Sequence, residues 1–190
     1  MTTPLEAGPE QGAERTIATL AEALTLRPPV SMDGPAVTDL IRNSPPLDVN
    51  SAYCNLLQCS HFADTCVVAV LEGKVVGWLS AHRPPSAPEQ IFVWQVAVDA
   101  AMRGARLSTR MMDELLARPS VRGAATLTAT ITEDNIASWG LFTALARRLG
   151  CSIEKTPIFL RDQHFAGAHD TEWQVSIGPL PTRTLPKPTR

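Results

Sequence analysis

The apolar residues of the chain cluster in short runs, separated by polar turns and by amphipathic stretches. Valine-rich runs lie on both sides of Glu72, Gly73 and Lys74, a pattern typical of a β-hairpin. Segment 90–99 (QIFVWQVAVD) is apolar at adjacent positions, which predicts a central strand that is buried on both faces. Further extended segments are expected at 27–31 (RPPVS), 125–131 (ATLTATI), 151–160 (CSIEKTPIFL) and 173–177 (WQVSI).

Amphipathic stretches between these runs predict four helices, which cover residues 31–44, 51–62, 103–119 and 135–150. The second helix has Tyr53, Leu56 and Leu57 on one stripe. The third turns an apolar face inward, made by Leu107, Met111 and Leu115. The fourth ends at Gly150, the residue type that favours a helix C-terminus.

The order of these elements predicts an α/β fold of the α+β type, with hairpins in place of strict βαβ alternation. A chain of 190 residues that is 44% hydrophobic suits one globular domain, expected at 27–180. Residues 1–26 are expected to form a mobile leader with weak helical content. Residues 181–190 are rich in proline and are expected to form a disordered tail.

Composition excludes several functional classes. The formal charge is −2 without a basic block, so binding of nucleic acid is not expected. No apolar run is long enough for a membrane span, and the N-terminus does not have the pattern of a signal peptide, which favours the cytoplasm. The four cysteines have no CxxC spacing, and His164 and His169 are too far apart for a helical metal pair, so no metal site is predicted.

The junction after the central strand is a candidate phosphate site. There a short turn with Gly104 leads directly into a helix, whose first backbone N–H groups are free to bind an anion. Gly104 allows the backbone to approach phosphate closely, and Arg103, Arg106 and Arg110 lie near one helical stripe. The alternative is that these arginines form the solvated face of an amphipathic helix.

This strand–turn–helix–strand order, followed by a helix that begins at an asparagine, resembles the GNAT superfamily of N-acetyltransferases. The resemblance implies a mixed central sheet flanked by helices, with acetyl-CoA bound between two splayed parallel strands. The superfamily signature is Gln/Arg-x-x-Gly-x-Gly/Ala, and this chain has Ala101 and Arg106 at its first and last positions. The resemblance assigns cofactor binding to Val96, Val98, Arg103, Gly104, Ala105, Arg106 and Asn135.

A narrower resemblance covers residues 27–180. It is carried by RPP, DG, PLDVNSAYCNLLQCSHFADTCVVA, WQVAVD, ITEDNIASWGLF, HFAGAHDTEW and IGP. These strings are similar to the L-2,4-diaminobutyric acid acetyltransferases, a GNAT family of ectoine biosynthesis. The resemblance implies acetyl transfer from acetyl-CoA to the 4-amino group of L-2,4-diaminobutyrate, by a homodimer without a metal.

Such a reaction needs a base, because an alkyl amine with a pKa near ~10 is protonated at neutral pH. A diamino acid also needs counter-charges for two ammonium groups, and the candidates for both tasks are Asp48 and Glu172. The alternatives are a turn cap for Asp48 and a solvated strand-end charge for Glu172. The backbone N–H near Val96 is expected to stabilise the oxyanion.

Other residues are candidates for holding the acceptor: Tyr53, Trp94, Gln95 and His169. Trp94 and Gln95 face opposite sides of their strand unless a bulge intervenes. Core packing is the alternative for Trp94 and Tyr53, and a surface or capping role for His169. Many superfamily members have a tyrosine that protonates the CoA thiolate, and this chain has Phe142 near that position. Asn135 is either a pantetheine ligand or only a helix cap.

Two other functions remain open at this point. The first is a GNAT enzyme for another small amine, which keeps the fold and changes only the acceptor pocket. The second is a CoA-binding homologue with weak or no turnover, which the departures at Ala101 and Arg106 motivate.

Overall fold

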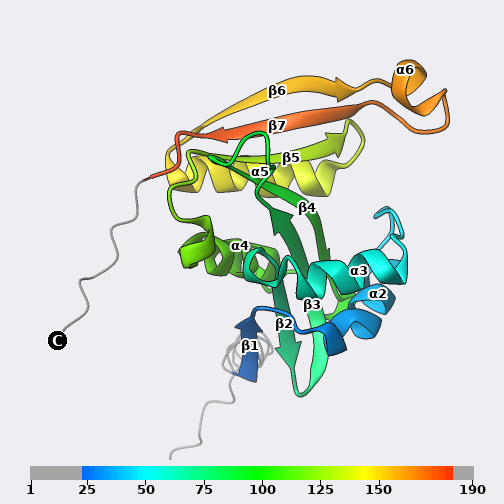
Figure 1. The fold of residues 1–190 in the computed structure, drawn as a ribbon, viewed down its shortest axis with the longest axis vertical. Coiled ribbons are helices and arrows are strands. Elements are labelled where there is room, and N and C mark those ends of the chain that lie inside the picture. Colours follow the sequence, from blue (N-terminus) through cyan, green and yellow to red (C-terminus); the bar gives the residue numbers. More distant parts are fainter. Residues whose placement is uncertain (1–22, 182–190) are drawn as a thin grey trace, which may run out of the picture.

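A seven-stranded sheet in the order β1-β2-β3-β4-β5-β7-β6 runs through the molecule (Figure 1). The structure is a computed structural model that describes residues 23–181. The strands are β1 (Leu24–Arg27), β2 (Val67–Leu71), β3 (Lys74–His82), β4 (Gln90–Val98), β5 (Thr126–Thr132), β6 (Ser152–Phe159) and β7 (Glu172–Gly178). The α-helices are α2 (Gly34–Arg42), α3 (Ala52–Ser60), α4 (Leu107–Ala117), α5 (Ile136–Leu149) and α6 (Arg161–Phe165). Short 3-10 turns are η1 (Ser31–Asp33), η2 (Ala63–Thr65), η3 (Ala100–Met102) and η4 (Pro119–Val121).

The centre of the sheet is splayed. β4 and β5 are parallel, and they pair only from Gln90 with Thr126 to Val93 with Ala129. The other neighbouring strands pair antiparallel. The second half of β4 therefore separates from the end of β5, and a gap in the hydrogen-bonding pattern opens at the middle of the sheet.

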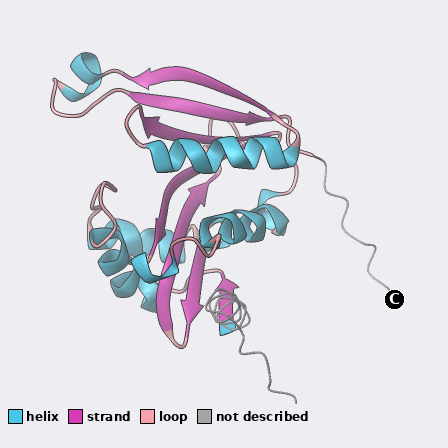
Figure 2. Ribbon diagram, turned by 180° about the vertical axis from the view of Figure 1, so that it is seen from behind, coloured by secondary structure: helices cyan, strands magenta, loops and turns pink. Residues whose placement is uncertain are grey.

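Helices cover both faces of the sheet. One core contains α2 residues such as Val37 and Ile41, packed with Trp78 of β3. The other core contains Met111 of α4 and Phe142 of α5. Figure 2 shows α5 lying along the β5–β7–β6 half of the sheet, with α4 beside the other half. The two layers fix the position of the loops that meet at the splayed strands.

A β-bulge in β4 reverses which alternate side chains of that strand point to each face of the sheet. Ser80 pairs with Gln95 but Ala81 pairs with Val93, so Trp94 is the extra residue. Before the bulge Val93 belongs to the core under α4 and α5, whereas after it Ala97 belongs to the core under α2 and α3. An extra residue in a strand shifts the two-residue alternation by one position, which is the physical reason for the exchange.

The predicted fold class is confirmed, and most of the expected strands and helices are present at close to their expected bounds. The extended segment expected at 27–31 is an exception, because β1 ends at Arg27 and Ser31 already belongs to η1. Leu107, Met111 and Leu115 are buried as predicted, and Gly150 ends α5 in the left-handed conformation with φ +66°. Glu72 and Gly73 form the hairpin turn, both with positive φ.

Four expectations need correction. β4 is central but alternates in burial, and Trp94 remains 45% exposed because the splay leaves that face uncovered. In α3, Tyr53 and Leu56 face outward, while Asn55 is buried because its amide donates to the hydroxyl of Thr38. Residues 24–26, assigned to the leader, form most of β1, because pairing with β2 overrides their weak helical tendency. The sequence also missed the short helix α6, which has few residues to carry a periodic pattern.

The single domain expected at 27–180 stays a prediction, and most of the predicted leader and tail lies outside the described residues. Within residues 23–181, no helix combines the length and hydrophobicity that a membrane span requires.

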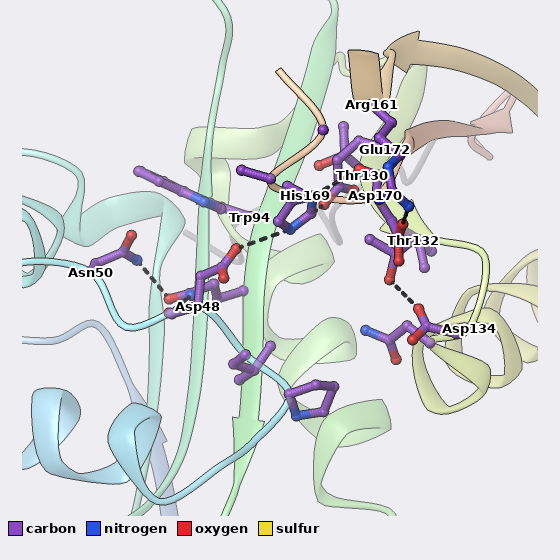
Figure 3. Close-up of a pocket in the computed structure, with 17 residues that line it drawn as sticks. Asp48, Asn50, Trp94, Thr130, Thr132, Asp134, Arg161, His169, Asp170 and Glu172 are labelled. Atoms are coloured by element: carbon purple, nitrogen blue, oxygen red, sulfur yellow. Dashed lines mark hydrogen bonds and ion pairs between the residues drawn. The ribbon is translucent and has the colours of Figure 1, made fainter. Parts of the chain in front are cut away.

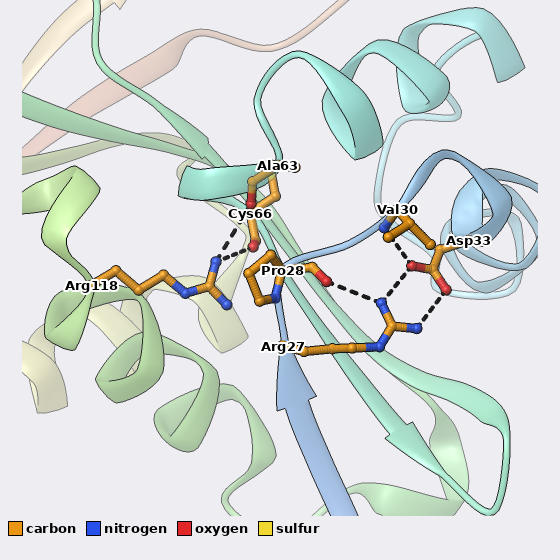
Figure 4. Close-up of polar contacts among 7 residues, drawn as sticks. All are labelled: Arg27, Pro28, Val30, Asp33, Ala63, Cys66 and Arg118. Carbon is orange, nitrogen blue, oxygen red and sulfur yellow. Dashed lines mark hydrogen bonds and ion pairs between the residues drawn. The ribbon is translucent and has the colours of Figure 1, made fainter.

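Two arginines fix main-chain segments near the end of β1 and around η2 (Figure 4). Arg118 donates to the main-chain carbonyl groups of Ala63 and Cys66. Arg27 forms a two-point ion pair with Asp33 at 2.7 and 2.8 Å, and Asp33 also accepts from the N–H of Val30 at 2.7 Å. The pKa of Asp33 is lowered, first by the hydrogen bonds from Arg27 and then by the Val30 N–H, against the opposing effect of burial.

We expect Arg27→Ala to lower the free energy of unfolding by about 1–3 kcal/mol, because it leaves the largely buried Asp33 carboxylate without its partner. The matched control is Arg42→Ala, whose exposed pair with Asp39 should contribute less than about 0.5 kcal/mol. Urea denaturation measures both. The stabilisation is present above the ordinary pKa of Asp33 and is lost as pH falls through the lowered value, so the difference from wild type should vanish there.

Candidate active site

A cavity of about 690 Å³, termed the acceptor cavity, opens where β4 and β5 separate (Figure 3). It is enclosed by the loop before α3, the bulge of β4, the end of β5 and the segment from α6 to β7. Its lining residues are Pro46, Leu47, Asp48, Asn50, Trp94, Gln95, Thr130, Ile131, Thr132, Asp134, Asn135, Arg161, Gly167, Ala168, His169, Asp170 and Glu172. Carboxylates predominate among its charged groups, so the cavity suits a cationic ligand.

Asp48 and Glu172 converge on one imidazole (Figure 3). His169 Nε2 lies 3.8 Å from Asp48 Oδ2 and 3.9 Å from Glu172 Oε1. His169 Nδ1 lies 2.8 Å from the carbonyl oxygen of Asp170, and because a carbonyl only accepts, Nδ1 carries the proton. Nε2 is therefore the atom that gains or loses a proton between the two carboxylates.

The two carboxylates differ in their exposure. The Asp48 side chain is 79% exposed, whereas that of Glu172 is 17% exposed. Burial raises the pKa of Glu172, as does the charge of Asp48, while His169 and the hydroxyl of Thr130 oppose this rise. Glu172 Oε2 is buried and has no hydrogen-bond partner among the described residues. A buried carboxylate oxygen without a partner is a binding position for a ligand N–H group.

The pKa of His169 is raised. The largest cause is its hydrogen bond to the Asp170 carbonyl, and the charges of Asp48, Glu172 and Asp170 add to it against the effect of burial. The ring also lies against Phe165, with 4.7 Å between the ring centroids. The ring is partly exposed and lines the cavity, so a role in binding the acceptor stays a prediction.

Gln95 positions the loop that carries Asp48. Its side chain is buried, its Nε2 donates to the carbonyl of Asp48 at 2.8 Å, and its Oε1 accepts from Asn50 Nδ2 at 2.9 Å. Both ends of the amide are thus occupied by protein groups. These hydrogen bonds position the loop, and Gln95 also lines the cavity, so its direct contact with the acceptor stays a prediction.

The two aromatic candidates have different positions. Trp94 lines the cavity as expected, on the same strand as Gln95, because the bulge brings both side chains to this end of the sheet. Tyr53 does not line it: α3 turns the polar residue Asn55 toward α2 and leaves the tyrosine ring 70% exposed on its outer face. The expected contact of Tyr53 with the acceptor stays a prediction, which the lining of this cavity does not support.

The sequence reasoning missed several lining residues. Asp134 accepts from the hydroxyl of Thr132 at 2.7 Å, and Arg161 pairs with Asp170 at 3.2 Å. Asn50 lies in the same loop as Asp48. None of these residues belongs to a motif with a chemical signature, and only the folded chain brings them to one cavity.

A second cavity of about 430 Å³, termed the acyl cavity, adjoins the first and lies between the end of β4 and the first turns of α5. Its lining includes Val96 and Val98 of β4, Arg103 of the turn after β4, and Ser108 of α4. Asn135 lines both this cavity and the first one. Within the described residues, Gly104, Ala105 and Arg106 are outside its lining, in the turn beside it.

The turn before α4 leaves open space beside its backbone. Gly104 has φ +81°, and a Cβ built there would meet no heavy atom within 4 Å, so the backbone is open on that side. Arg106 precedes α4 with φ +54°, a left-handed conformation that glycine adopts more easily. Its side chain does not line the splayed cavity, so it does not obstruct the path of pantetheine there.

Asn135 has the helix-cap role that the sequence offered, and its role as a pantetheine ligand stays a prediction. Its Oδ1 accepts from the N–H of Ser138 at 3.1 Å, which makes it the N-cap of α5. It also lines both cavities, so the capped end of α5 marks the point where they meet. Within residues 23–181, no group of three or more histidine, cysteine or acidic side chains is arranged to hold a metal ion.

Comparison with known proteins identifies the class of protein. The model of the acetyltransferase (GNAT) family matches residues 35–146, a segment that runs from α2 through most of α5. The chain belongs to this family, and the resemblance on the strand–turn–helix junction is confirmed.

The relatives narrow the family further. The chain is 45% identical over 157 residues to the L-2,4-diaminobutyric acid acetyltransferase of Methylotuvimicrobium alcaliphilum, which covers 83% of this chain and 91% of the relative. It is 41% identical to that of Halomonas elongata, over 90% of this chain and 88% of the relative. A solved structure of the diaminobutyrate acetyltransferase from Paenibacillus lautus, in complex with its substrate L-2,4-diaminobutyric acid and coenzyme A, is similar with a TM-score of 0.80 and 34% identity, over 85% of this chain and 98% of that one. Within the GNAT family, the chain belongs to the L-2,4-diaminobutyric acid acetyltransferases.

Proposed function

We propose that the chain transfers the acetyl group of acetyl-CoA to the 4-amino group of L-2,4-diaminobutyrate, a step of ectoine biosynthesis. The observation that carries the proposal is the pair of adjoining cavities: one lined by Asp48, His169 and Glu172, the other running along the end of β4 to Arg103 and the start of α4. The relatives that share most of this sequence are diaminobutyric acid acetyltransferases.

Glu172 is the base in this proposal. It is the less exposed of the two carboxylates, its raised pKa makes it a stronger proton acceptor than an ordinary glutamate, and its Oε2 has no protein partner. It takes a proton from the 4-ammonium group, and the freed nitrogen lone pair then forms a bond to the thioester carbonyl carbon. The C–S bond breaks as the tetrahedral intermediate collapses. The sulfur leaves as thiolate and takes, directly or through water, the proton that the attacking nitrogen loses when it becomes the amide.

Asp48 holds the 2-ammonium group at the exposed side of the cavity. Gln95 and Asn50 fix its loop, so the carboxylate is available before the acceptor binds. His169, between the two carboxylates, balances their charge when it is protonated. The backbone N–H near Val96 would stabilise the oxyanion, because β4 leaves β5 at this point and Val96 lines the acyl cavity.

We also propose that the protein acts as a homodimer in the cytoplasm. Exposed apolar side chains at Val49, Tyr53 and Leu56 support a partner surface beside the acceptor cavity. The cysteines of the described residues are free, and Cys59 and Cys66 are buried, which agrees with a reducing compartment. Light scattering of the purified protein measures the mass of the assembly and tests the first of these two proposals.

The purified protein should convert L-2,4-diaminobutyrate and acetyl-CoA to the 4-acetyl product. Two-dimensional NMR locates the new amide, since an acetyl group on the 4-nitrogen couples to the terminal methylene and one on the 2-nitrogen to the α-carbon. Ornithine and putrescine are the comparison acceptors, because they keep the amines but change the spacing or remove the carboxylate. A higher kcat/KM with either would favour a GNAT enzyme for another amine, and CoA binding without product would favour a homologue without turnover.

A further inference from the structure

The side chain of Lys155 on β6 lies against two tryptophan rings and a carboxylate. Its Nζ lies 4.0 Å from the ring centroid of Trp173 on β7 and 4.8 Å from that of Trp139 on α5. The same ammonium group donates to Glu133 Oε1 at 3.2 Å. A cation this close to an indole face is attracted by the negative charge of the ring face. These four residues, termed the lysine cage, connect β6 to β7, to α5 and to the loop after β5.

The lysine cage lies on the face of the sheet that α5 covers. Lys155 pairs with Val175 of β7, which belongs to the core under α5, and directly opposite residues point to the same face. Trp173 shares this face with Val175, because they are two residues apart in the strand. The neighbouring Glu172 points to the other face and lines the acceptor cavity. Lys155 therefore does not contact an acceptor, and it acts on the site only through its neighbours.

The partners of Lys155 are directly joined to the wall of the acceptor cavity. Trp173 follows Glu172 in β7, and Glu133 follows the lining residue Thr132. The indole Nε1 of Trp139 donates to the carbonyl oxygen of Thr132 at 3.0 Å. Thr132 and Glu172 are themselves paired across β5 and β7. The lysine cage thus fixes, from behind, the two strand ends that form this wall.

The same contacts fix the point where the two cavities meet. The N–H of Asn135, which lines both cavities, donates to the carbonyl of Thr132 at 3.2 Å. The carbonyl of Asn135 accepts from the N–H of Trp139 at 3.1 Å. A movement of Trp139 would therefore move this point relative to Glu172. Misplacement of reacting groups by about 1 Å can lower a rate by ~100-fold.

We infer that Lys155 is a positioning residue for acetyl transfer, which holds Glu172 and the wall at residues 132–135 at the separation that the reaction needs. This inference rests on the proposed function, in which Glu172 is the base. The contacts with the two rings carry the effect, because Glu133 is 78% exposed and such an ion pair contributes little by itself.

The test compares steady-state acetylation of diaminobutyrate by wild type, Lys155→Met and Lys155→Arg. Methionine keeps the apolar part of the side chain without its charge, whereas arginine keeps a cation that stacks on indole rings. Lys155→Met should lower kcat by ~5-fold or more and leave KM for diaminobutyrate within about 2-fold, because only the alignment in the transition state is lost. Lys155→Arg should restore kcat to within about 2-fold of wild type.

The matched control is Arg122→Met, which removes an exposed positive charge in the turn before β5, outside both cavities. It should leave kcat and KM unchanged.

Two further measurements test the lysine cage itself. In wild type, the NMR signals of the Lys155 Cε protons should lie upfield of the ordinary lysine position, because the ring currents of two indoles shield them. Trp173→Leu should move these signals back toward that position. The double variant Lys155→Met/Trp173→Leu should have the kcat of the poorer single variant within about 2-fold, since both changes remove the same contacts.

Several results would overturn the inference. They are an unchanged kcat in Lys155→Met, a loss that lies in KM alone, and a loss that Lys155→Arg does not restore. Failure of Lys155→Met to fold, detected by circular dichroism, would assign the lysine to stability instead. Unshifted Lys155 signals, or independent effects in the double variant, would show that the lysine and the rings do not act together.

Failure of the proposed function gives a different result. If wild type acetylates ornithine or putrescine in place of diaminobutyrate, the acceptor proposal is wrong, and the same comparison of kcat with that amine still supports or overturns the role of Lys155. Wild type without turnover of any of these amines would remove both proposals.

Discussion

Replacement of Glu172 by glutamine should lower kcat/KM for diaminobutyrate at neutral pH by ~100-fold or more, the range that a general base contributes. The amide keeps the shape of the side chain but cannot take the proton from the 4-ammonium group. The affinity for CoA should stay within about 2-fold of wild type, because Glu172 lines only the acceptor cavity. Initial rates and calorimetry measure the two effects separately.

The pH dependence identifies the role of Glu172. Only its charged form accepts a proton, and its pKa is raised by burial, so the acidic limb of the kcat/KM profile should lie above the pH at which an ordinary glutamate titrates. This limb should disappear in Glu172→Gln. In Asp48→Asn, kcat/KM should fall by ~10-fold but the limb should remain, since Asp48 binds the 2-ammonium group in the proposal.

The matched control for this experiment is Glu154→Gln on the exposed strand β6, which removes the same charge outside the cavity and should leave kcat/KM unchanged. Full activity of both Glu172→Gln and Asp48→Asn would show that other groups recognise the acceptor. Asp170, which also lines the cavity, would then be the next residue to replace.

Gly104→Val should weaken CoA binding by ~10-fold or more. Gly104 has φ +81°, and a β-branched residue there costs about 1–3 kcal/mol or shifts the turn. No protein atom lies within 4 Å of the position that a Cβ would take, so the new side chain would occupy the open space beside the proposed pyrophosphate site. Calorimetry with CoA measures the change directly.

The chain contains a matched control for the strain. Gly123 has φ +76° and equally open surroundings, but it lies in the turn before β5, away from the acyl cavity. Gly123→Val should lower stability by a similar amount and leave the CoA affinity at its wild-type value. Equal CoA affinities in both variants would place the pyrophosphate elsewhere in the structure.

Local patterns in the sequence were sufficient for the elements and for the class of protein. Alternating or continuous apolar runs predicted the hairpin of β2 and β3 and the central strand β4, because strand and helix periods depend on neighbouring residues alone. The Gly-containing turn before α4 is present as predicted for the same reason, and phosphate binding there stays a prediction. The strings around WQVAVD and HFAGAHDTEW were specific enough to indicate the family, which the relatives confirm.

Only the tertiary structure decided how the acceptor cavity is built. Asp48 and Glu172 lie in distant parts of the chain, and they converge on His169 only because the sheet and its loops place them there. The bulge at Trp94 depends on pairing with β3, and it turns Gln95 toward the loop of Asp48. Such positions depend on backbone pairing and on hydrogen bonds between residues far apart in sequence, which leave no local pattern.

The outer face of α3 shows the same limit. Tyr53 and Leu56 form an apolar stripe that local periodicity would bury, but the structure buries Asn55 instead because Thr38 of α2 accepts a hydrogen bond from its amide. Burial of a polar residue is favourable only when a partner is present, and that partner comes from another element. The sequence alone thus determined which segments form helices and strands, whereas the choice of the buried face required the packed neighbours.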